Sequence, residues 1–223
     1  MNRTASLASL ALTLASPAHA EDLRVDPDAG NSTFSAVFDA PLGERITAQS
    51  AAVGCELRYD EETGLASGRC SVPLASVRVD NEDTKTDHFR QWVTNRKSDP
   101  SACRLEATFG DVRIGALAPG QPVPFVARVP FTVCGRRPAD GRLEAVKGTA
   151  LLFRPGAYGD ARTVRIRATI EGFEREAYRI GPRFTDGWLA RVQSLAAVVA
   201  DRGTIDLSLF ARSSGAAAAA AAK

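Results

Sequence analysis

The chain has 223 residues, of which 44% are hydrophobic, so it is long enough to bury the core of one sizeable domain. Its 28 lysine and arginine residues nearly balance its 26 aspartate and glutamate residues. No run of basic residues occurs, which excludes the electrostatic footprint expected of a nucleic-acid-binding protein.

Residues 1–20 have the pattern of a secretory signal peptide. Asn2-Arg3 precedes an apolar stretch from Leu7 to Leu14, and Ala18-His19-Ala20 supplies small residues for cleavage. The alternative is a membrane anchor, but the apolar stretch is shorter than the roughly 20 residues that cross a bilayer. We therefore expect cleavage after Ala20, a periplasmic protein, and a mature chain in which His88 is the only histidine.

Most of the remaining chain alternates apolar and polar residues, as strands do when one face of their sheet is wet. The apolar rows are Phe34, Ala36 and Phe38; Val53, Cys55, Leu57 and Tyr59; Cys70, Val72 and Leu74; Cys103, Leu105 and Ala107; Phe125, Ala127, Val129, Phe131 and Val133; Val164, Ile166, Ala168 and Ile170; and Ile205, Leu207 and Leu209. A sheet of this kind hides its edges by curling into a barrel. We predict an all-β fold over residues 21–212: an antiparallel up-and-down β-barrel of about eight strands.

Three segments depart from this alternation. Residues 80–87 are polar and lead into an apolar stripe of Phe89, Trp92 and Val93, which predicts a short helix capped by Asp80 or Thr84 and ended by Asp99-Pro100. Residues 111–124 have the glycines and prolines of a loop, and residues 186–201 have the spacing of a second helix. Residues 213–223 form a low-complexity, alanine-rich tail that we exclude from the fold.

The four cysteines, Cys55, Cys70, Cys103 and Cys134, favour two disulfides because the chain is predicted to be exported. Three pairings are possible. A hairpin that pairs residue 60 with residue 65 places Cys55 opposite Cys70, so we prefer Cys55–Cys70 and Cys103–Cys134. Zinc is the alternative, but no Cys-x-x-Cys spacing occurs, and we predict no metal site.

His88 beside Asp87 is the one arrangement that suggests general-base catalysis. A nucleophilic mechanism would need a positioned serine, and the chain has no Gly-x-Ser-x-Gly motif. The acidic residues Asp80, Glu82, Asp83 and Asp87 lack the ligand spacing and the central glycine of a calcium loop. A solvated loop explains both features, so we expect a protein that is not an enzyme and has no cofactor.

Several segments resemble the YceI-like family of exported, lipocalin-like proteins that bind polyisoprenoid lipids. Val25-Asp26-Pro27 with the row from Ser32 to Phe38 is similar to the opening strand of that family. The strand, polar loop, His88-Phe89 pair and helix between Leu74 and Leu105 are similar to its central segment, and residues 175–181 are similar to its last segment before the final strand. The order Lys85-Thr86-Asp87-His88-Phe89 and the four cysteines depart from the family pattern.

The resemblance implies that the apolar rows line a tunnel for an isoprenoid-type lipid, such as a quinone or a polyprenyl chain. The predicted ligand-binding residues are Phe34, Phe38, Leu57, Tyr59, Val72, Leu74, Leu105, Phe125, Val129, Phe131, Val164, Ile166, Ile170 and Leu207. A lipid carrier would exchange its cargo with a membrane donor or acceptor. The alternative is a periplasmic stress- or redox-associated interaction module, with a filled barrel, no lipid cargo and a membrane redox partner.

Overall fold

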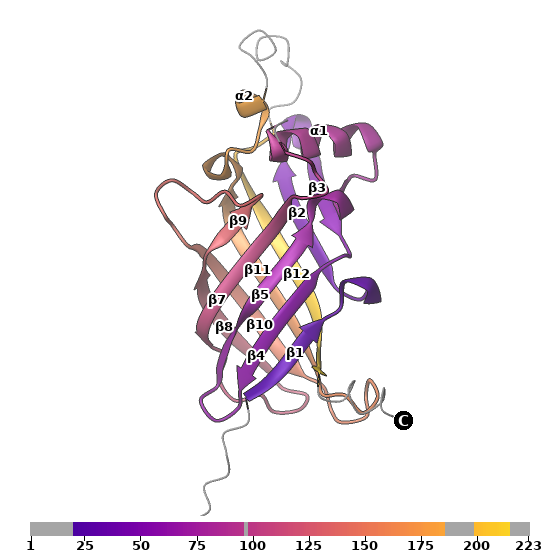
Figure 1. Cartoon of the computed structure of the whole chain (residues 1–223), viewed down its shortest axis with the longest axis vertical. Coiled ribbons are helices and arrows are strands. Elements are labelled where there is room, and N and C mark those ends of the chain that lie inside the picture. The colour runs from indigo at the N-terminus through magenta and orange to yellow at the C-terminus, as the bar shows by residue number, and fades with distance from the viewer. Residues whose placement is uncertain (1–19, 96–97, 186–198, 215–223) are drawn as a thin grey trace, which may run out of the picture.

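The computed structural model describes residues 20–95, 98–185 and 199–214. Twelve strand segments form one antiparallel sheet that curls into a barrel, with helix α1 across one end (Figure 1). The strands are β1 (Ala20–Val25), β2 (Thr33–Asp39), β3 (Arg45–Ser50), β4 (Gly54–Asp60), β5 (Leu65–Pro73), β6 (Arg78–Val79), β7 (Arg104–Arg113), β8 (Pro122–Val129), β9 (Phe131–Val133), β10 (Glu144–Leu152), β11 (Thr163–Glu174) and β12 (Arg202–Ser213).

The helices are short and lie in the connections. They are α1 (Asp83–Thr94) and α2 (Pro182–Thr185), with the single 3-10 turns η1 (Pro27–Ala29), η2 (Pro41–Gly43), η3 (Leu74–Ser76) and η4 (Arg175–Tyr178). No helix in the part of the chain that the structure describes is long and apolar enough to cross a membrane.

The twelve segments make eight barrel strands, because four of those strands are each broken into two segments. β1 and β2 both run antiparallel to β12 and are separated by η1. β4 pairs with β1 while β3 pairs with β2, and β5 pairs with β4 while β6 pairs with β3. β8 pairs with β10 and β9 pairs with β7, with Pro130 between them. The predicted antiparallel barrel of about eight strands is confirmed.

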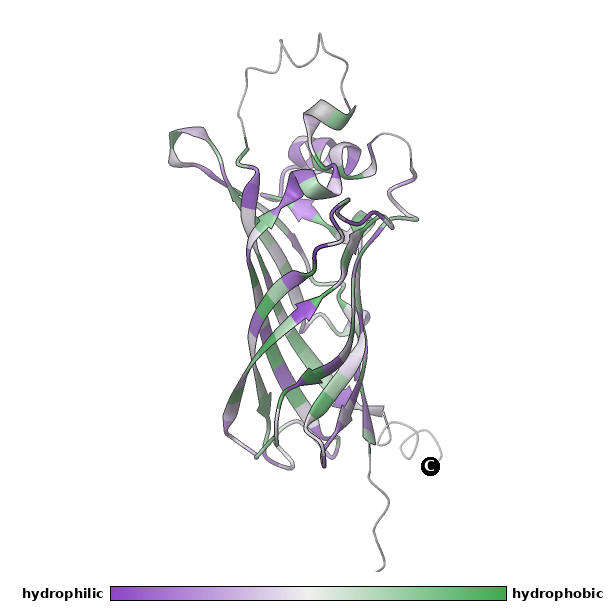
Figure 2. Ribbon diagram, turned by 90° about the vertical axis from the view of Figure 1, so that its left-hand side faces the viewer, coloured by the Kyte–Doolittle hydropathy of each residue, from purple (hydrophilic) through white to green (hydrophobic). Residues whose placement is uncertain are grey.

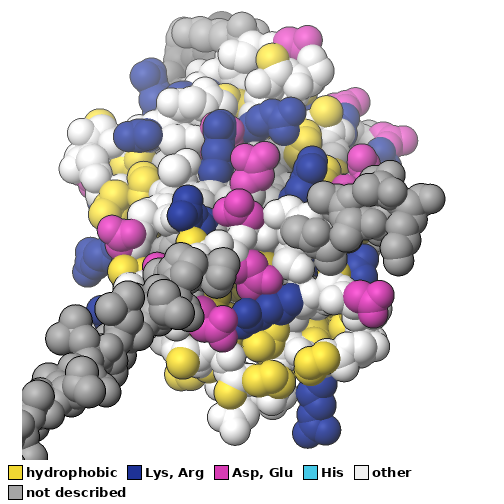
Figure 3. All heavy atoms as spheres, turned by 60° about the horizontal axis from the view of Figure 1, so that its bottom comes forward, with side chains coloured by type: hydrophobic (Ala, Val, Ile, Leu, Met, Phe, Trp, Pro, Cys, Tyr) yellow, Lys and Arg dark blue, Asp and Glu magenta, His cyan; other side chains and the backbone are white. Residues whose placement is uncertain are grey.

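The core lies inside the barrel, because alternate residues of each strand point inward. In β4 the inward residues Cys55, Leu57 and Tyr59 are buried, whereas Glu56 and Arg58 are exposed. Figure 2 shows the resulting alternation of hydrophobic and hydrophilic residues along the strands. On the outside, acidic and basic side chains are interspersed at the end of the barrel away from α1 (Figure 3).

A seam separates the lower part of β7 from β8, where no paired register joins them in the described chain. Thr108 donates its N–H to the carbonyl oxygen of Pro130, so residue 130 faces β7. Alternation then places Pro122 and Pro124 on the same edge of β8. Proline has no N–H, so this edge lacks two of the donors that a ladder to β7 would need.

Both predicted disulfides are present, Cys55–Cys70 and Cys103–Cys134. The hairpin register is the predicted one, with Asp60 opposite Leu65 and Cys55 opposite Cys70. Cys134 leaves β9 in a left-handed conformation (φ 48°), which allows it to reach Cys103 although it breaks the alternation of Phe131 and Val133.

Some predicted boundaries are wrong. Helix α1 starts after Glu82 without a side-chain cap and stops at Asn95, in a left-handed conformation, instead of running to Asp99-Pro100. β7 continues to Arg113 and β8 starts at Pro122, so the loop is shorter than residues 111–124. Leu74 lies in η3 instead of a strand. Residues 1–19, most of the helix predicted over 186–201, and residues 215–223 lie outside the described part of the chain.

Candidate functional site

Two cavities lie one above the other inside the barrel. The upper cavity, next to α1, has a volume of about 430 Å³, and the lower cavity has a volume of about 110 Å³. Known small-molecule sites have volumes of about 300–1,000 Å³. The upper cavity falls within this range, whereas the lower one is smaller.

Helix α1 forms the roof of the upper cavity, and its apolar stripe of Phe89, Trp92 and Val93 borders the space below. Two side chains fix its position. The Thr86 hydroxyl donates to the Glu82 carbonyl oxygen (2.7 Å) and accepts from the backbone N–H of Val79 (3.0 Å), while Arg90 donates to the carbonyl oxygens that precede the helix. The roof is thereby tied to the rim of the barrel.

Lys85 and Arg175 are the cationic side chains that border the upper cavity in the described chain, and both are engaged. Lys85 lies 3.0 Å from the Asp80 carboxylate and 2.9 Å from that of Glu82, and these hydrogen bonds raise the pKa of Lys85.

Arg175 is buried and donates to the carbonyl oxygens of Val199, Ala200 and Ile180. It also donates to the Asp201 carboxylate (2.8 Å). Each cation is therefore neutralised by at least one carboxylate of the protein itself, and neither is left to attract an anion.

The lower cavity is lined almost entirely by apolar side chains, from Leu23 of β1 to Leu209 of β12. Phe125 borders it, and the ring lies so close to Gly148 of β10 that a Cβ atom there would collide with it. The floor includes Leu117, whose backbone N–H donates to the hydroxyl of Tyr59 (3.2 Å). An apolar space of this kind favours an apolar occupant over water.

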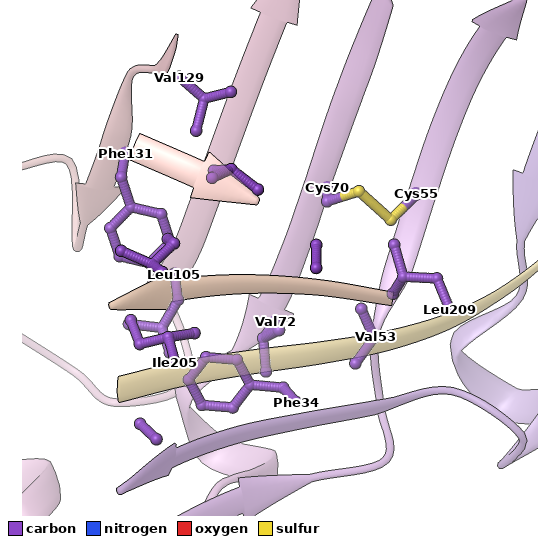
Figure 4. Close-up of a cluster of buried hydrophobic side chains, with 14 of the residues drawn as sticks. Phe34, Val53, Cys55, Cys70, Val72, Leu105, Val129, Phe131, Ile205 and Leu209 are labelled. Atoms are coloured by element: carbon purple, nitrogen blue, oxygen red, sulfur yellow. A yellow bond between two sulfur atoms is a disulfide. The ribbon is translucent and has the colours of Figure 1, made fainter. Parts of the chain in front are cut away.

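The structure brings most of the predicted ligand-binding residues to one cavity or the other. Phe34, Phe38 and Leu105 border the upper cavity; Leu57, Tyr59, Phe125, Val129, Val164, Ile166, Ile170 and Leu207 border the lower one; and Phe131 borders both. Val72 and Leu74 are buried in the core and border neither cavity. Figure 4 shows Val72 in this packed cluster.

Other cavity residues were missed by the sequence analysis. Phe89 and Trp92 were assigned to the apolar stripe of a helix but not to a ligand site, although that stripe was the signal. Phe173 breaks the even-numbered alternation of Val164 to Ile170 because the register of β11 shifts between Glu171 and Phe173. A single extra residue in a strand is not visible in the alternation of one sequence.

His88 lies exposed on α1 and borders the upper cavity. The Asp87 carboxylate lies 3.8 Å from the Arg90 guanidinium, and no hydrogen bond joins it to His88 in the described chain. Within residues 20–95, 98–185 and 199–214, no group of three or more histidine, cysteine, aspartate or glutamate side chains is placed to hold a metal ion.

A solved structure shares this architecture: a polyisoprenoid binding domain from Saccharophagus degradans implicated in plant cell wall breakdown. The match covers 87% of this chain and 99% of that one, with a TM-score of 0.56 and 14% sequence identity. The chain has the fold of a polyisoprenoid-binding domain. The fold implied by the YceI-like resemblance is therefore confirmed. No protein-family model matches the chain, and no curated protein matches it.

Proposed function

We propose that this protein is exported to the periplasm and there sequesters or carries an apolar, chain-like lipid inside its barrel. The observation that carries the proposal is the pair of apolar cavities along the barrel axis. Each methylene group that leaves water for such a space contributes about 0.8 kcal/mol, so a long chain binds tightly with few polar contacts. The structural neighbour is a polyisoprenoid binding domain, which agrees with this cargo class.

The charges around the upper cavity favour an uncharged headgroup, such as that of an isoprenoid quinone or a polyprenol. A diphosphate headgroup would need unpaired cations. Lys85 and Arg175 are instead paired with Asp80, Glu82 and Asp201. We therefore propose a neutral isoprenoid as the ligand.

Export is supported by the two disulfides, which persist in oxidising compartments. The mass of the secreted protein should correspond to a chain that begins at Glu21. Retention of residues 1–20 in the mature protein would contradict the proposed cleavage after Ala20.

Cargo exchange with a membrane is supported by Leu42. This residue is 100% exposed on the turn between β2 and β3, at the α1 end of the barrel. A lone exposed leucine is common, but this one lies at the end of the barrel that holds the larger cavity. Leu42→Asp should slow lipid transfer from vesicles and leave the equilibrium affinity unchanged; equal transfer rates would remove Leu42 from the mechanism.

The decisive experiment is native mass spectrometry of freshly purified protein. A co-purified neutral isoprenoid supports the carrier function, and the delipidated protein should then take up a quinone in preference to a prenyl diphosphate of the same chain length. Protein that is always free of lipid and takes up none would contradict the carrier function and favour the interaction module.

A further inference from the structure

Phe131 is, among the described residues, the only one that borders both cavities. It follows Pro130 at the start of β9, opposite Ala107 of β7, and its side chain is 6% exposed. Figure 4 shows the ring directed inward, on the same side as Leu105 and Ile205. The ring therefore lies at the level where the upper space ends and the lower space begins.

Two other aromatic rings hold Phe131 in this position. Its centroid lies 5.6 Å from that of Phe173 and 5.7 Å from that of Tyr178, both edge-to-face, and those two rings stack on each other at 4.9 Å. Edge-to-face pairs of this kind stabilise a fixed ring orientation.

Tyr178 is itself anchored at both ends. Its hydroxyl donates to the buried carboxylate of Glu144 (2.7 Å), and its carbonyl oxygen accepts from Arg136 Nε (3.1 Å). The aromatic cluster of Phe131, Phe173 and Tyr178 is thus preorganised instead of being loose packing that a ligand could push aside without cost.

The two cavities differ in what they can hold. The upper cavity has the size of a ligand site, whereas the lower cavity of about 110 Å³ is well below the usual range of about 300–1,000 Å³. Because Phe131 is the described residue that borders both cavities, a chain that extends from the upper cavity into the lower one comes up against its ring.

We propose that Phe131 is a specificity-determining residue that limits the length of the apolar chain this barrel accepts. This inference rests on the proposed function. A chain that ends above Phe131 gains binding energy with every added methylene. A longer chain must displace the aromatic cluster, so its additional methylenes add little to affinity.

The test uses the delipidated full-length mature protein and a graded series of all-trans prenols, from geraniol to solanesol. Binding is read by native mass spectrometry and by intrinsic tryptophan fluorescence, because one of the two tryptophans of the chain, Trp92, borders the upper cavity. In the wild type, affinity should rise about fourfold for each buried methylene and then reach a plateau. In Phe131→Leu, the plateau should move to a longer prenol.

Two further variants make the result specific. Adding Ile166→Trp to Phe131→Leu should return the plateau to the wild-type position, because Ile166 borders the lower cavity. Leu74 is buried and borders neither cavity, so Leu74→Ala should lower the melting temperature without moving the plateau. If Phe131→Leu does not fold, Phe131→Met provides the same test with a flexible side chain of similar volume.

The outcomes separate the inference from the function on which it rests. A wild type that binds no prenol contradicts the proposed function. A wild type that binds prenols with a plateau that Phe131→Leu and Phe131→Met leave in place overturns the role of Phe131 and leaves the carrier function standing. A wild type whose affinity rises along the whole series without a plateau also overturns it.

Discussion

The hydroxyl of Tyr59 donates a hydrogen bond to the carbonyl oxygen of Gly115 (2.9 Å), 56 residues further along the chain. The same hydroxyl accepts from the backbone N–H of Leu117 (3.2 Å). One side chain of β4 thereby holds the connection between β7 and β8 against the bottom of the barrel. Leu117, which is buried, closes the lower cavity as a result.

Tyr59→Phe should destabilise the protein by about 1–3 kcal/mol, because the buried N–H of Leu117 loses its acceptor. The free energy of unfolding in urea measures this change. Tyr158→Phe is the control, since Tyr158 is 46% exposed on the outer surface and should change stability little. Equal stability of the two variants would show that the Tyr59 hydrogen bonds contribute nothing to the floor.

The pKa shifts of Tyr59 and Tyr178 predict a loss of stability at alkaline pH. Burial raises the pKa of Tyr59, and burial followed by the hydrogen bond to Glu144 raises that of Tyr178. The folded chain therefore keeps protons that the unfolded chain releases from about pH 10 upward. The contribution of these two tyrosines to the free energy of unfolding should be constant below pH 10 and fall above it. The fall should be shallower in Tyr59→Phe. Identical slopes for wild type and variant would contradict the burial of Tyr59.

The disulfides should be fully formed in the secreted protein. Alkylation of the unfolded, unreduced chain should add no mass, and peptide mapping should find Cys55 with Cys70 and Cys103 with Cys134. On the chain-entropy model, sequence separations of 15 and 31 residues correspond to about 3 and about 3.7 kcal/mol of stabilisation. Incorporation of label at four cysteines would argue against an oxidising compartment.

Enlarging a side chain should affect stability differently at Ile166 and Val72, although both lie on apolar rows in the sequence. Ile166 borders the lower cavity, so Ile166→Trp should fill space and cost little stability. Val72 is packed on all sides, so Val72→Trp should destabilise by about 1–3 kcal/mol or more through overpacking. Melting temperatures of the delipidated variants measure the difference. A large loss at Ile166 would mean that the lower cavity is a filled core.

His88→Ala should leave lipid affinity nearly unchanged, because His88 is exposed to solvent where it borders the upper cavity and most of the other lining side chains are apolar. The affinity for a quinone and the melting temperature are the measurements. Loss of a catalytic activity on this substitution would support an enzyme instead of a carrier.

Much of the barrel was predictable because alternation is a local property of each strand. The hairpin that pairs Asp60 with Leu65 fixed the register of Cys55 and Cys70 in the same way, since its turn is short. Alternation reports which face of a strand is apolar, but not how closely that face is packed. Val72 and Ile166 therefore look equivalent in the sequence, although only Ile166 borders a cavity.

The parts that were not predictable depend on single residues that interrupt the period. Asn95 ends α1 before Asp99-Pro100 because it adopts a left-handed conformation, which an asparagine permits but does not require. The register shift in β11 places Phe173 in the upper cavity on the opposite parity from Ile170. The division of the lumen at Phe131 depends on contacts with Phe173 and Tyr178, which lie more than 40 residues away in the sequence.

The prolines along the β8 edge of the seam also affect the tendency of this protein to aggregate with other copies of itself. An incompletely hydrogen-bonded strand edge is normally a template on which a second chain adds a strand, and repeated addition leads to fibrils. Pro122 and Pro124 withhold the N–H groups that such an incoming strand would bind, and they do so on the side where the barrel's own ladder is interrupted. The edge that cannot complete a ladder to β7 is for the same reason a poor template for a strand of another molecule.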